Sequence, residues 1–138
     1  MILKHKFHPT ILREYDIRGI VNEDLSELDA FMLGYFFGLT VRKKIHLFKS
    51  PKIIVSRDGR NSSENLLKNL IKGLLKSGSK IINIGLNPTP TLYFANEYFS
   101  ADGSIQVTGS HNPKNYNGFK MIALNNSFYG KDIIKLGE

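Results

Sequence analysis

The chain has 138 residues and no cysteine, which excludes a disulfide, a thiolate nucleophile and a cysteine-ligated zinc site. Hydrophobic residues make up 41% of it, as in ordinary globular domains and unlike disordered chains. The net charge of +7 favours an anionic partner, which could be nucleic acid, an acidic membrane surface or a phosphorylated small molecule.

The length fits a single domain with one hydrophobic core. The first sixteen residues contain scattered Lys and His and lack the continuous apolar region of a secretory signal. The most apolar stretch, residues 28–41, is too short to cross a bilayer. We therefore expect a cytoplasmic protein without a membrane partner.

The first predicted helix begins after Ser26, whose hydroxyl can cap it, and runs to about Lys44. It is apolar on almost every side, so we expect it to be packed on more than one side. Gly34 and Gly38 are four residues apart, which indicates close packing against another helix.

A second helix is predicted from Ser62 or Ser63 to a left-handed C′ residue at Gly78. Its apolar face comprises Leu66, Leu67, Leu70, Ile71, Leu74 and Leu75. Its opposite face carries Lys68, Lys72 and Lys76. A solvated face explains this lysine stripe better than a phosphate-backbone contact, so no nucleic-acid partner is predicted, and charge-driven nucleic-acid binding is kept as an alternative.

Strands and one more helix alternate through the rest of the chain. The predicted strands are 52–56, 80–85, 103–107 and 119–124, with a helix within 87–99, a turn at 125–130 and the start of a helix in 131–138. This alternation predicts an α/β fold with three layers, α/β/α, around a mixed, mostly parallel sheet. Ligands gather beyond the carboxyl ends of parallel strands, where we expect the loops 57–60 and 108–113 to share one rim.

The loop TGSHNPKNYNGFK, residues 108–120, contains the strongest candidates for catalytic residues: a serine, a histidine and a lysine. Neighbouring side chains in an extended stretch point opposite ways, so a Ser110–His111 general-base pair and a hydrolase are disfavoured. Gly109 is expected to supply backbone freedom, with turns at Asn112-Pro113 and at Asn117-Gly118. Lys120 should lie on the strand face opposite to its two neighbours, which holds its ammonium near the loop.

A serine surrounded by cations is suited to carrying a phosphoryl group, because the added negative charge needs them. Arg18, in the segment EYDIRG, offers a planar donor fork for phosphate, and Tyr15 lies three residues before it. For this segment alone, a simple ion pair between Asp16 and Arg18 is the competing interpretation.

The loop at 108–120 resembles the phosphoserine loop of the α-D-phosphohexomutases. REYDIRG (13–19), SRDGRNSS (56–63) and NPTPTLYFA (87–95) resemble the other first-domain landmarks of that family and occur in the same order. The ending YNGFKM (116–121) is similar to the phosphomannomutase/phosphoglucomutase branch.

The resemblance implies that Ser110 is the phosphorylated residue and exchanges its phosphoryl group with a hexose 1-phosphate or 6-phosphate through a bisphosphorylated sugar. Hexose 1,6-bisphosphate would be the activator, and Mg²⁺ would bind the phosphoryl oxygens on Ser110. His111 and Lys120 would flank the nucleophile, with Lys120 as general acid and base. Arg18 and Tyr15 would border the transferring group, and Lys120 and Arg18 would also bind the substrate.

Asp58 and Arg60 are assigned mainly to bracing the rim, with direct contact as the lesser alternative. Family members have four domains, and residues 1–138 resemble the first, without the metal, sugar and phosphate loops of domains II–IV. We therefore expect the isolated chain to have little or no mutase turnover. A non-catalytic remnant that acts as a binding domain is the alternative.

Overall fold

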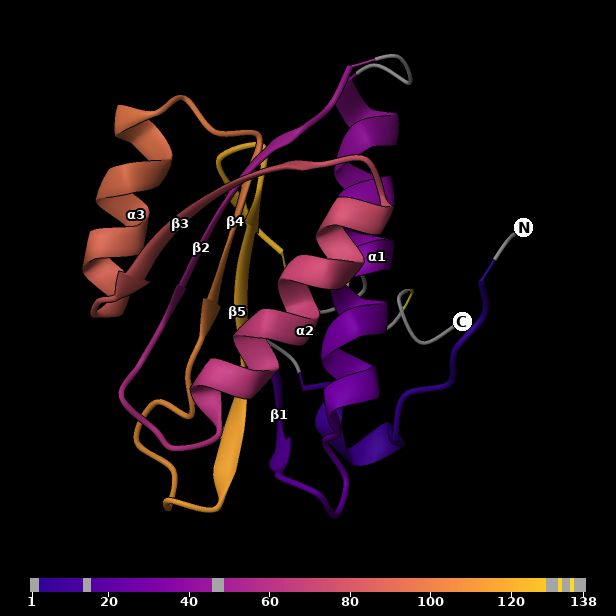
Figure 1. The fold of residues 1–138 in the computed structure, drawn as a ribbon, viewed down its shortest axis with the longest axis vertical. Helices are drawn as coiled ribbons and strands as arrows, with labels where there is room; N and C mark the ends of the chain where they lie inside the picture. The colour runs from indigo at the N-terminus through magenta and orange to yellow at the C-terminus, as the bar shows by residue number, and fades with distance from the viewer. Residues whose placement is uncertain (1–2, 14–15, 46–48, 129–131, 133–134, 136–138) are drawn as a thin grey trace.

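The computed structural model describes residues 3–13, 16–45, 49–128, 132 and 135. Within this part of the chain a six-stranded sheet forms the middle layer of the molecule (Figure 1). Helices α1 (Glu27–Ile45) and α2 (Ser63–Lys76) cover one face of the sheet, and α3 (Thr89–Tyr98) covers the other. The predicted three-layer α/β/α fold is confirmed.

The sheet is mixed. Its strands are β1 (Ile17–Ile20), β2 (Lys52–Arg57), β3 (Lys80–Leu86), β4 (Gly103–Val107), β5 (Tyr116–Ala123) and β6 (Asn126–Ser127), preceded by a short 3-10 helix, η1 (Pro9–Ile11). The order across the sheet is β1-β5-β4-β2-β3, with β6 paired to β5. Since β5 is antiparallel to β1, β4 and β6, and the β2 pairings are parallel, the described strands other than β5 all share one direction.

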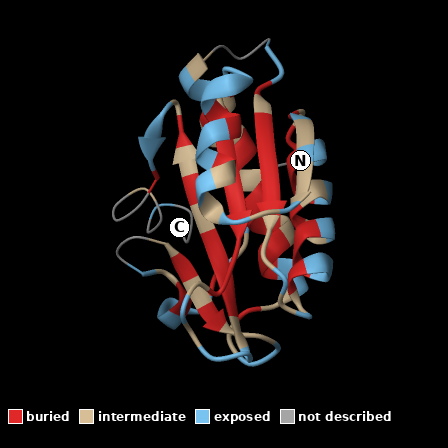
Figure 2. Ribbon diagram, turned by 90° about the vertical axis from the view of Figure 1, so that its left-hand side faces the viewer, coloured by how far each residue is buried: buried red, intermediate tan, exposed pale blue. Residues whose placement is uncertain are grey.

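The larger part of the core lies between the sheet and the two helices α1 and α2. Phe37 of α1 is fully buried there with Ile53, Val55 and Ile105 from the strands. A smaller cluster around Ile54 lies under α3. Figure 2 shows the strands as a mostly buried layer between the helices. The alternation of side chains along β2 therefore divides its residues between the two clusters.

Helices α1 and α2 approach each other closely enough to exclude a side chain at the contact. A Cβ added at Gly34 would lie 2.3 Å from the carbonyl oxygen of Leu70, and one at Gly73 would lie 1.9 Å from that of Phe31. The close packing predicted from Gly34 is confirmed. Ser26 caps α1 as predicted, with its hydroxyl accepting a hydrogen bond from the Asp29 N–H at 3.1 Å.

The predicted second helix is present, with one correction to its apolar face. Gly78 has a φ of +90° directly after the cap, as expected for a C′ glycine. The lysine stripe is exposed, in agreement with the solvated-face interpretation. Leu75 is wrong as a core residue, because 57% of it is exposed.

The turn predicted at Asn117-Gly118 is wrong, since both residues lie inside β5. Asn117 is fully buried and donates hydrogen bonds to the hydroxyls of Ser62 and Ser63. A Cβ on Gly118 would lie 2.1 Å from the carbonyl oxygen of Ile17. Asn117 thus makes a buried polar contact, and Gly118 allows the close approach of β1. Local turn statistics reveal neither role.

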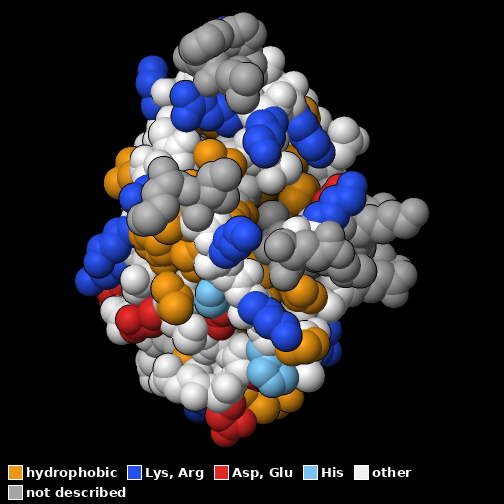
Figure 3. Space-filling model, turned by 90° about the vertical axis from the view of Figure 1, so that its right-hand side faces the viewer, with side chains coloured by type: hydrophobic (Ala, Val, Ile, Leu, Met, Phe, Trp, Pro, Cys, Tyr) orange, Lys and Arg blue, Asp and Glu red, His pale blue; other side chains and the backbone are white. Residues whose placement is uncertain are grey.

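Strand β1 was not predicted, because its four residues pair with β5, about one hundred positions later in the chain. The helix predicted in 131–138 falls largely outside the described residues. Among the described residues, no helix is both long and apolar enough to cross a membrane. Figure 3 shows the right-hand face of Figure 1, where Lys and Arg side chains are interspersed with uncharged and hydrophobic ones.

Candidate active site

The loops that follow β2 and β4 meet at one edge of the sheet, as predicted. The carboxylate of Asp58 accepts hydrogen bonds from the Thr108 hydroxyl at 2.9 Å and from the Gly109 N–H at 3.1 Å. Because β2 and β4 are parallel neighbours, their carboxyl ends deliver both loops to the same rim. The two loops therefore form one hydrogen-bonded unit.

Arg60 occupies the inside of the loop at 108–115. Its guanidinium donates hydrogen bonds to the backbone carbonyl oxygens of Ser110, Asn112, Pro113 and Tyr116, at 2.8, 2.8, 2.6 and 3.3 Å. Its Nε also donates to the Asp58 carboxylate at 3.2 Å. The side chain replaces the partners that the loop backbone would otherwise take from water. The bracing role predicted for Arg60 and Asp58 is thus visible in their contacts.

The carboxylate of Asp58 is held by hydrogen bonds next to this loop. Its carboxylate accepts hydrogen bonds from Ser63 Oγ, Arg60 N, Thr108 Oγ1 and Gly109 N. Burial on its own would raise the pKa of Asp58, but these hydrogen bonds outweigh it and leave the pKa below the ordinary 3.8. The carboxylate is therefore ionised at neutral pH and is committed to holding the loop.

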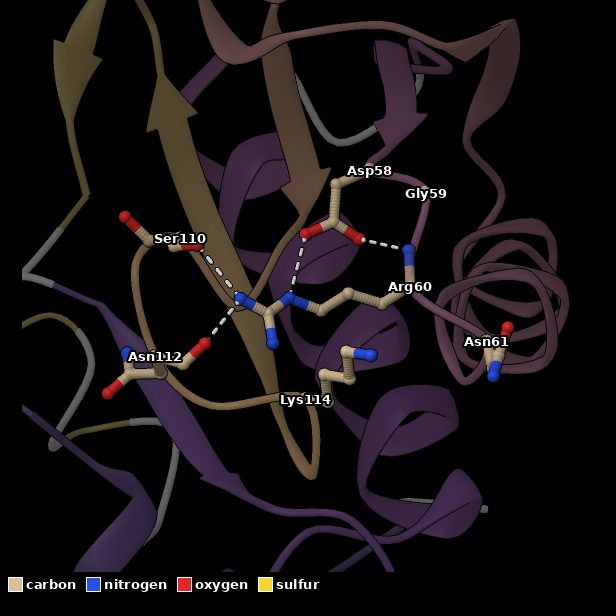
Figure 4. A pocket seen from close by; sticks show the side chains of 7 residues that line it. All are labelled: Asp58, Gly59, Arg60, Asn61, Ser110, Asn112 and Lys114. Atoms are coloured by element: carbon tan, nitrogen blue, oxygen red, sulfur yellow. Dashed lines mark hydrogen bonds and ion pairs between the residues drawn. The ribbon is translucent and has the colours of Figure 1, made fainter.

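Ser110 has a left-handed backbone, with φ of 54°. Its N–H donates to Thr108 Oγ1 at 2.9 Å and its carbonyl oxygen accepts from Arg60, so both sides of the residue are fixed. Figure 4 shows its side chain pointing away from the guanidinium of Arg60. No hydrogen bond to its Oγ is found among the described residues. The hydroxyl is half-buried and available to an external group.

The conformational freedom expected at Gly109 is found instead at Ser110. Gly109 has no positive φ, and the reason for a glycine there is steric. A Cβ at Gly109 would lie 2.4 Å from Cζ of Arg60. The left-handed conformation of a non-glycine residue is strained, and the surrounding hydrogen bonds hold it.

Arg18 reaches the same loop from β1. Its Nη1 donates to the carbonyl oxygen of Gly109 at 3.1 Å, and its Nη2 forms an ion pair with Asp16. The predicted ion pair and the predicted approach to the serine loop thus occur together. The Nε of Arg18 is buried and has no hydrogen-bond partner among the described residues.

Lys120 lies on β5, on the face opposite to the buried Phe119 and Met121, as predicted. Its side chain is half-buried, and Arg18 stands on the same face because it pairs with Gly118, two residues before Lys120. His111 is exposed at the tip of the loop. Tyr15 lies outside the described residues.

A cavity of about 450 Å³ opens beside the loop (Figure 4). It is lined by Asp58, Gly59, Arg60, Asn61, Ser110, Asn112 and Lys114. Lys114 and Asn61 were not singled out from the sequence, because isolated Lys and Asn residues in loops carry no specific signal. Buried Gln106 on β4 was missed for a similar reason, since the strand GSIQV is otherwise ordinary.

Comparison with known proteins identifies the architecture. A family profile described as phosphoglucomutase/phosphomannomutase, alpha/beta/alpha domain I, matches residues 9–136. The chain belongs to this family.

Relatives in the phosphoglucomutase/phosphomannomutase family cover most of the chain. A phosphomannomutase/phosphoglucomutase of Pseudomonas syringae is 39% identical over 129 residues, which are 94% of this chain and 27% of that protein. A phosphomannomutase of Klebsiella pneumoniae is 40% identical over 116 residues, which are 84% of this chain and 69% of that protein.

A solved structure of a phosphoglucomutase/phosphomannomutase family protein from Burkholderia thailandensis superposes with a TM-score of 0.85 at 36% identity. The match covers 94% of this chain and 29% of that structure. The chain thus spans between a quarter and a third of the Pseudomonas and Burkholderia relatives.

Proposed function

We propose that this chain is the phosphoserine domain, domain I, of a phosphohexomutase that interconverts hexose 1-phosphate and hexose 6-phosphate. The observation that carries the proposal is the geometry of Ser110. Hydrogen bonds on both sides fix its backbone, while its hydroxyl has no partner among the described residues. A nucleophile held in this way needs little reorganisation to meet a phosphoryl group.

In the proposed reaction the P–O bond to Ser110 Oγ breaks as a new P–O bond forms to a free hydroxyl of the hexose monophosphate. The proton of that hydroxyl passes to a base, and the sugar becomes a 1,6-bisphosphate. In the second half the other phosphoryl group transfers to Ser110 Oγ, and the departing sugar oxygen regains a proton. Phosphate has then moved between the two ends of the sugar with no net loss.

Arg18 and Lys120 supply positive charge on one face of the sheet beside the loop, which supports a role for both in stabilising the transferring group. We assign proton transfer to Lys120, because β5 holds it rigidly. His111 is exposed, which leaves it free to contact a substrate that approaches from outside. Tyr15 is proposed as a substrate contact from the family resemblance alone.

Mg²⁺ is proposed to bind phosphoryl oxygens on Ser110 and to neutralise their charge. Among the described residues, no group of three or more His, Asp or Glu side chains could hold a metal ion. Asp58 is engaged by hydrogen bonds with its own loop. The family resemblance implies that the remaining metal ligands, and the groups that recognise the sugar, lie in domains II–IV.

It follows from this division that the isolated chain would show little or no turnover. The test is therefore phosphorylation of Ser110, measured by intact mass after exposure to hexose 1,6-bisphosphate with Mg²⁺, with the remaining family domains supplied in trans. We expect one added phosphate on the wild type and none on Ser110→Ala. Ser50→Ala, at an exposed serine away from the loop, is the matched control and should gain the phosphate.

Equal phosphorylation of Ser110→Ala and the wild type would rule out this serine. The alternative is a non-catalytic domain that retains the fold and the motifs. It would be favoured if Ser110 gained no phosphate and no mutase activity appeared, both for the chain alone and with the remaining domains supplied.

A further inference from the structure

Strand β4, which leads into the loop at 108–115, carries a buried oxygen that has no hydrogen-bond partner in the described part of the chain. Gln106 of β4 is 1% exposed, and its Oε1 is buried with no hydrogen-bond partner among the described residues. Its Nε2 donates to the carbonyl oxygen of Asn87 at 2.8 Å. This contact fixes the orientation of the amide, because a flipped amide would set two oxygens against each other. The unpaired atom is therefore an acceptor that needs a donor.

Two side chains flank Gln106 on the same face of the sheet. Ser56 of β2 and Lys120 of β5 are its direct register partners. The Ser56 hydroxyl already donates its proton to the carbonyl oxygen of Gly85 at 2.9 Å. Lys120 has three ammonium protons, and no hydrogen bond of this ammonium is found among the described residues. Lys120 is thus the flanking donor that is available.

This hydrogen bond is not formed in the structure, but the register places the two side chains close enough for it to form once the Lys120 side chain turns toward the amide. Residues directly opposite in an antiparallel pair have Cβ atoms about 5 Å apart, within reach of two long side chains. Both side chains are at least half-buried, so bulk water competes poorly for the amide oxygen. Arg18, the other cation on this face, stands on β1 with β5 between it and Gln106.

We propose that Gln106 is a positioning residue for Lys120, with Gln106 Oε1 accepting a hydrogen bond from Lys120 Nζ. This inference rests on the proposed function, in which Lys120 transfers the proton. The bond would hold the amine at one orientation and leave its other protons directed toward the phosphoryl acceptor. The amide is itself anchored through Asn87, whose N–H donates to the carbonyl oxygen of Arg57 at 3.1 Å.

The test compares two variants of Gln106. Both lose the amide N–H that donates a hydrogen bond to the carbonyl oxygen of Asn87. Gln106→Glu keeps an acceptor oxygen that can face Lys120, while its second oxygen lies against the carbonyl oxygen of Asn87. Gln106→Met has a similar volume and no such acceptor. The readout is hydrogen exchange of the Lys120 ammonium, followed by NMR in the isolated chain with ¹⁵N-labelled lysine. The signal is assigned by its loss in Lys120→Arg.

We expect slow exchange in the wild type and in Gln106→Glu, and exchange faster by about tenfold in Gln106→Met, as loss of a charge-assisted hydrogen bond predicts. Equal exchange in the wild type and Gln106→Met would overturn the proposal. So would equally fast exchange in both variants, because that result assigns the effect to the lost Asn87 contact.

A reciprocal measurement tests the same contact and does not require the Gln106 variants to fold. Lys120→Met, at a half-buried position on the strand, should shift the side-chain ¹³Cδ resonance of Gln106. An unchanged resonance would contradict the contact. None of these measurements involves phosphoryl transfer, so a failure of Ser110 to accept phosphate would leave them interpretable and would count against the proposed function alone.

With the remaining domains supplied, Gln106→Met should lower kcat with little change in KM, and Gln106→Glu should restore it. If Gln106 had a purely structural role, both variants would lower kcat and thermal stability together.

Discussion

Arg60 holds the backbone of Ser110 and leaves the serine hydroxyl without a partner among the residues that the structure describes. The Nη2 of Arg60 donates to the carbonyl oxygen of Ser110 at 2.8 Å, across fifty positions of sequence, while the serine side chain points the other way (Figure 4). A residue from one loop thus fixes the conformation of the proposed nucleophile in another.

Replacing this guanidinium should loosen the loop. Lysine cannot reproduce a planar fork that donates to several carbonyl oxygens at once, so Arg60→Lys is expected to lower the free energy of unfolding by about 2–4 kcal/mol. Amide hydrogen exchange should accelerate most in residues 108–116. Denaturant unfolding and exchange NMR would measure the two effects.

Arg57→Lys is the matched control, because among the described residues the Arg57 guanidinium makes one hydrogen bond, to the carbonyl oxygen of Asp58 at 3.2 Å. It should change stability by less than about 1 kcal/mol. If both substitutions cost the same, the loop does not depend on Arg60 in the way its contacts indicate.

Asp58 should make stability depend on pH in acid. Its pKa in the folded chain lies below the ordinary 3.8, because its hydrogen bonds outweigh burial. Its contribution is therefore fully present above about pH 4, the unfolded pKa, and is lost as the pH falls through the lower folded pKa. Thermal unfolding from pH 6 down to pH 2 would follow this loss.

Asp58→Asn cannot titrate and should show a shallower loss of stability below about pH 4 than the wild type, from a lower starting value. Parallel curves for the two proteins would show that other carboxylates account for the acid sensitivity.

The contact between α1 and α2 should not accept a methyl group. Gly34→Ala and Gly73→Ala each place a Cβ within 2.3 Å of a backbone oxygen, so each should destabilise the fold by about 1–3 kcal/mol or more, despite the better helix propensity of alanine. Gly59→Ala is the control, since a Cβ there would lie 3.9 Å from a methyl carbon of Leu86, an ordinary van der Waals contact. Destabilisation of equal size at Gly59 would contradict the packing argument.

Lys120 should matter for the rate of transfer and little for folding. With the remaining domains supplied, Lys120→Met is expected to slow phosphoryl transfer from Ser110 by about 10²–10⁴-fold, the range for loss of a general acid or base. Rapid-quench measurement of phosphoserine decay would test this. Lys80→Met, at an exposed lysine on β3, should transfer at the wild-type rate. If phosphoserine decayed at the wild-type rate in Lys120→Met, Lys120 would not be the proton-transfer residue.

Local patterns were sufficient for most of the elements. The second helix followed from its apolar spacing and from Gly78, and the strands at 52–57 and 80–86 followed from short β-branched runs bounded by turns. In each case the signal lies within a few residues, because helix periodicity and capping are local properties.

The errors arose where a distant partner decides the structure. Asn117 and Gly118 have the composition of a turn, but the buried hydroxyl of Ser63 and the backbone of β1 place them in a strand. Backbone freedom was expected at Gly109, whereas the left-handed residue is Ser110, whose carbonyl oxygen is held by Arg60.

The sequence by itself determined that this chain forms a three-layer α/β domain with a serine loop at the end of a strand, because periodicity, capping and motif spacing are written into neighbouring residues. Only the tertiary structure decided how that loop is held and which side chains face it. Those features depend on hydrogen bonds between Arg60, Asp58 and a loop fifty positions away, and on a register that sets Gln106 opposite Lys120. Such contacts form only when the parallel strands bring the loops to one edge of the sheet.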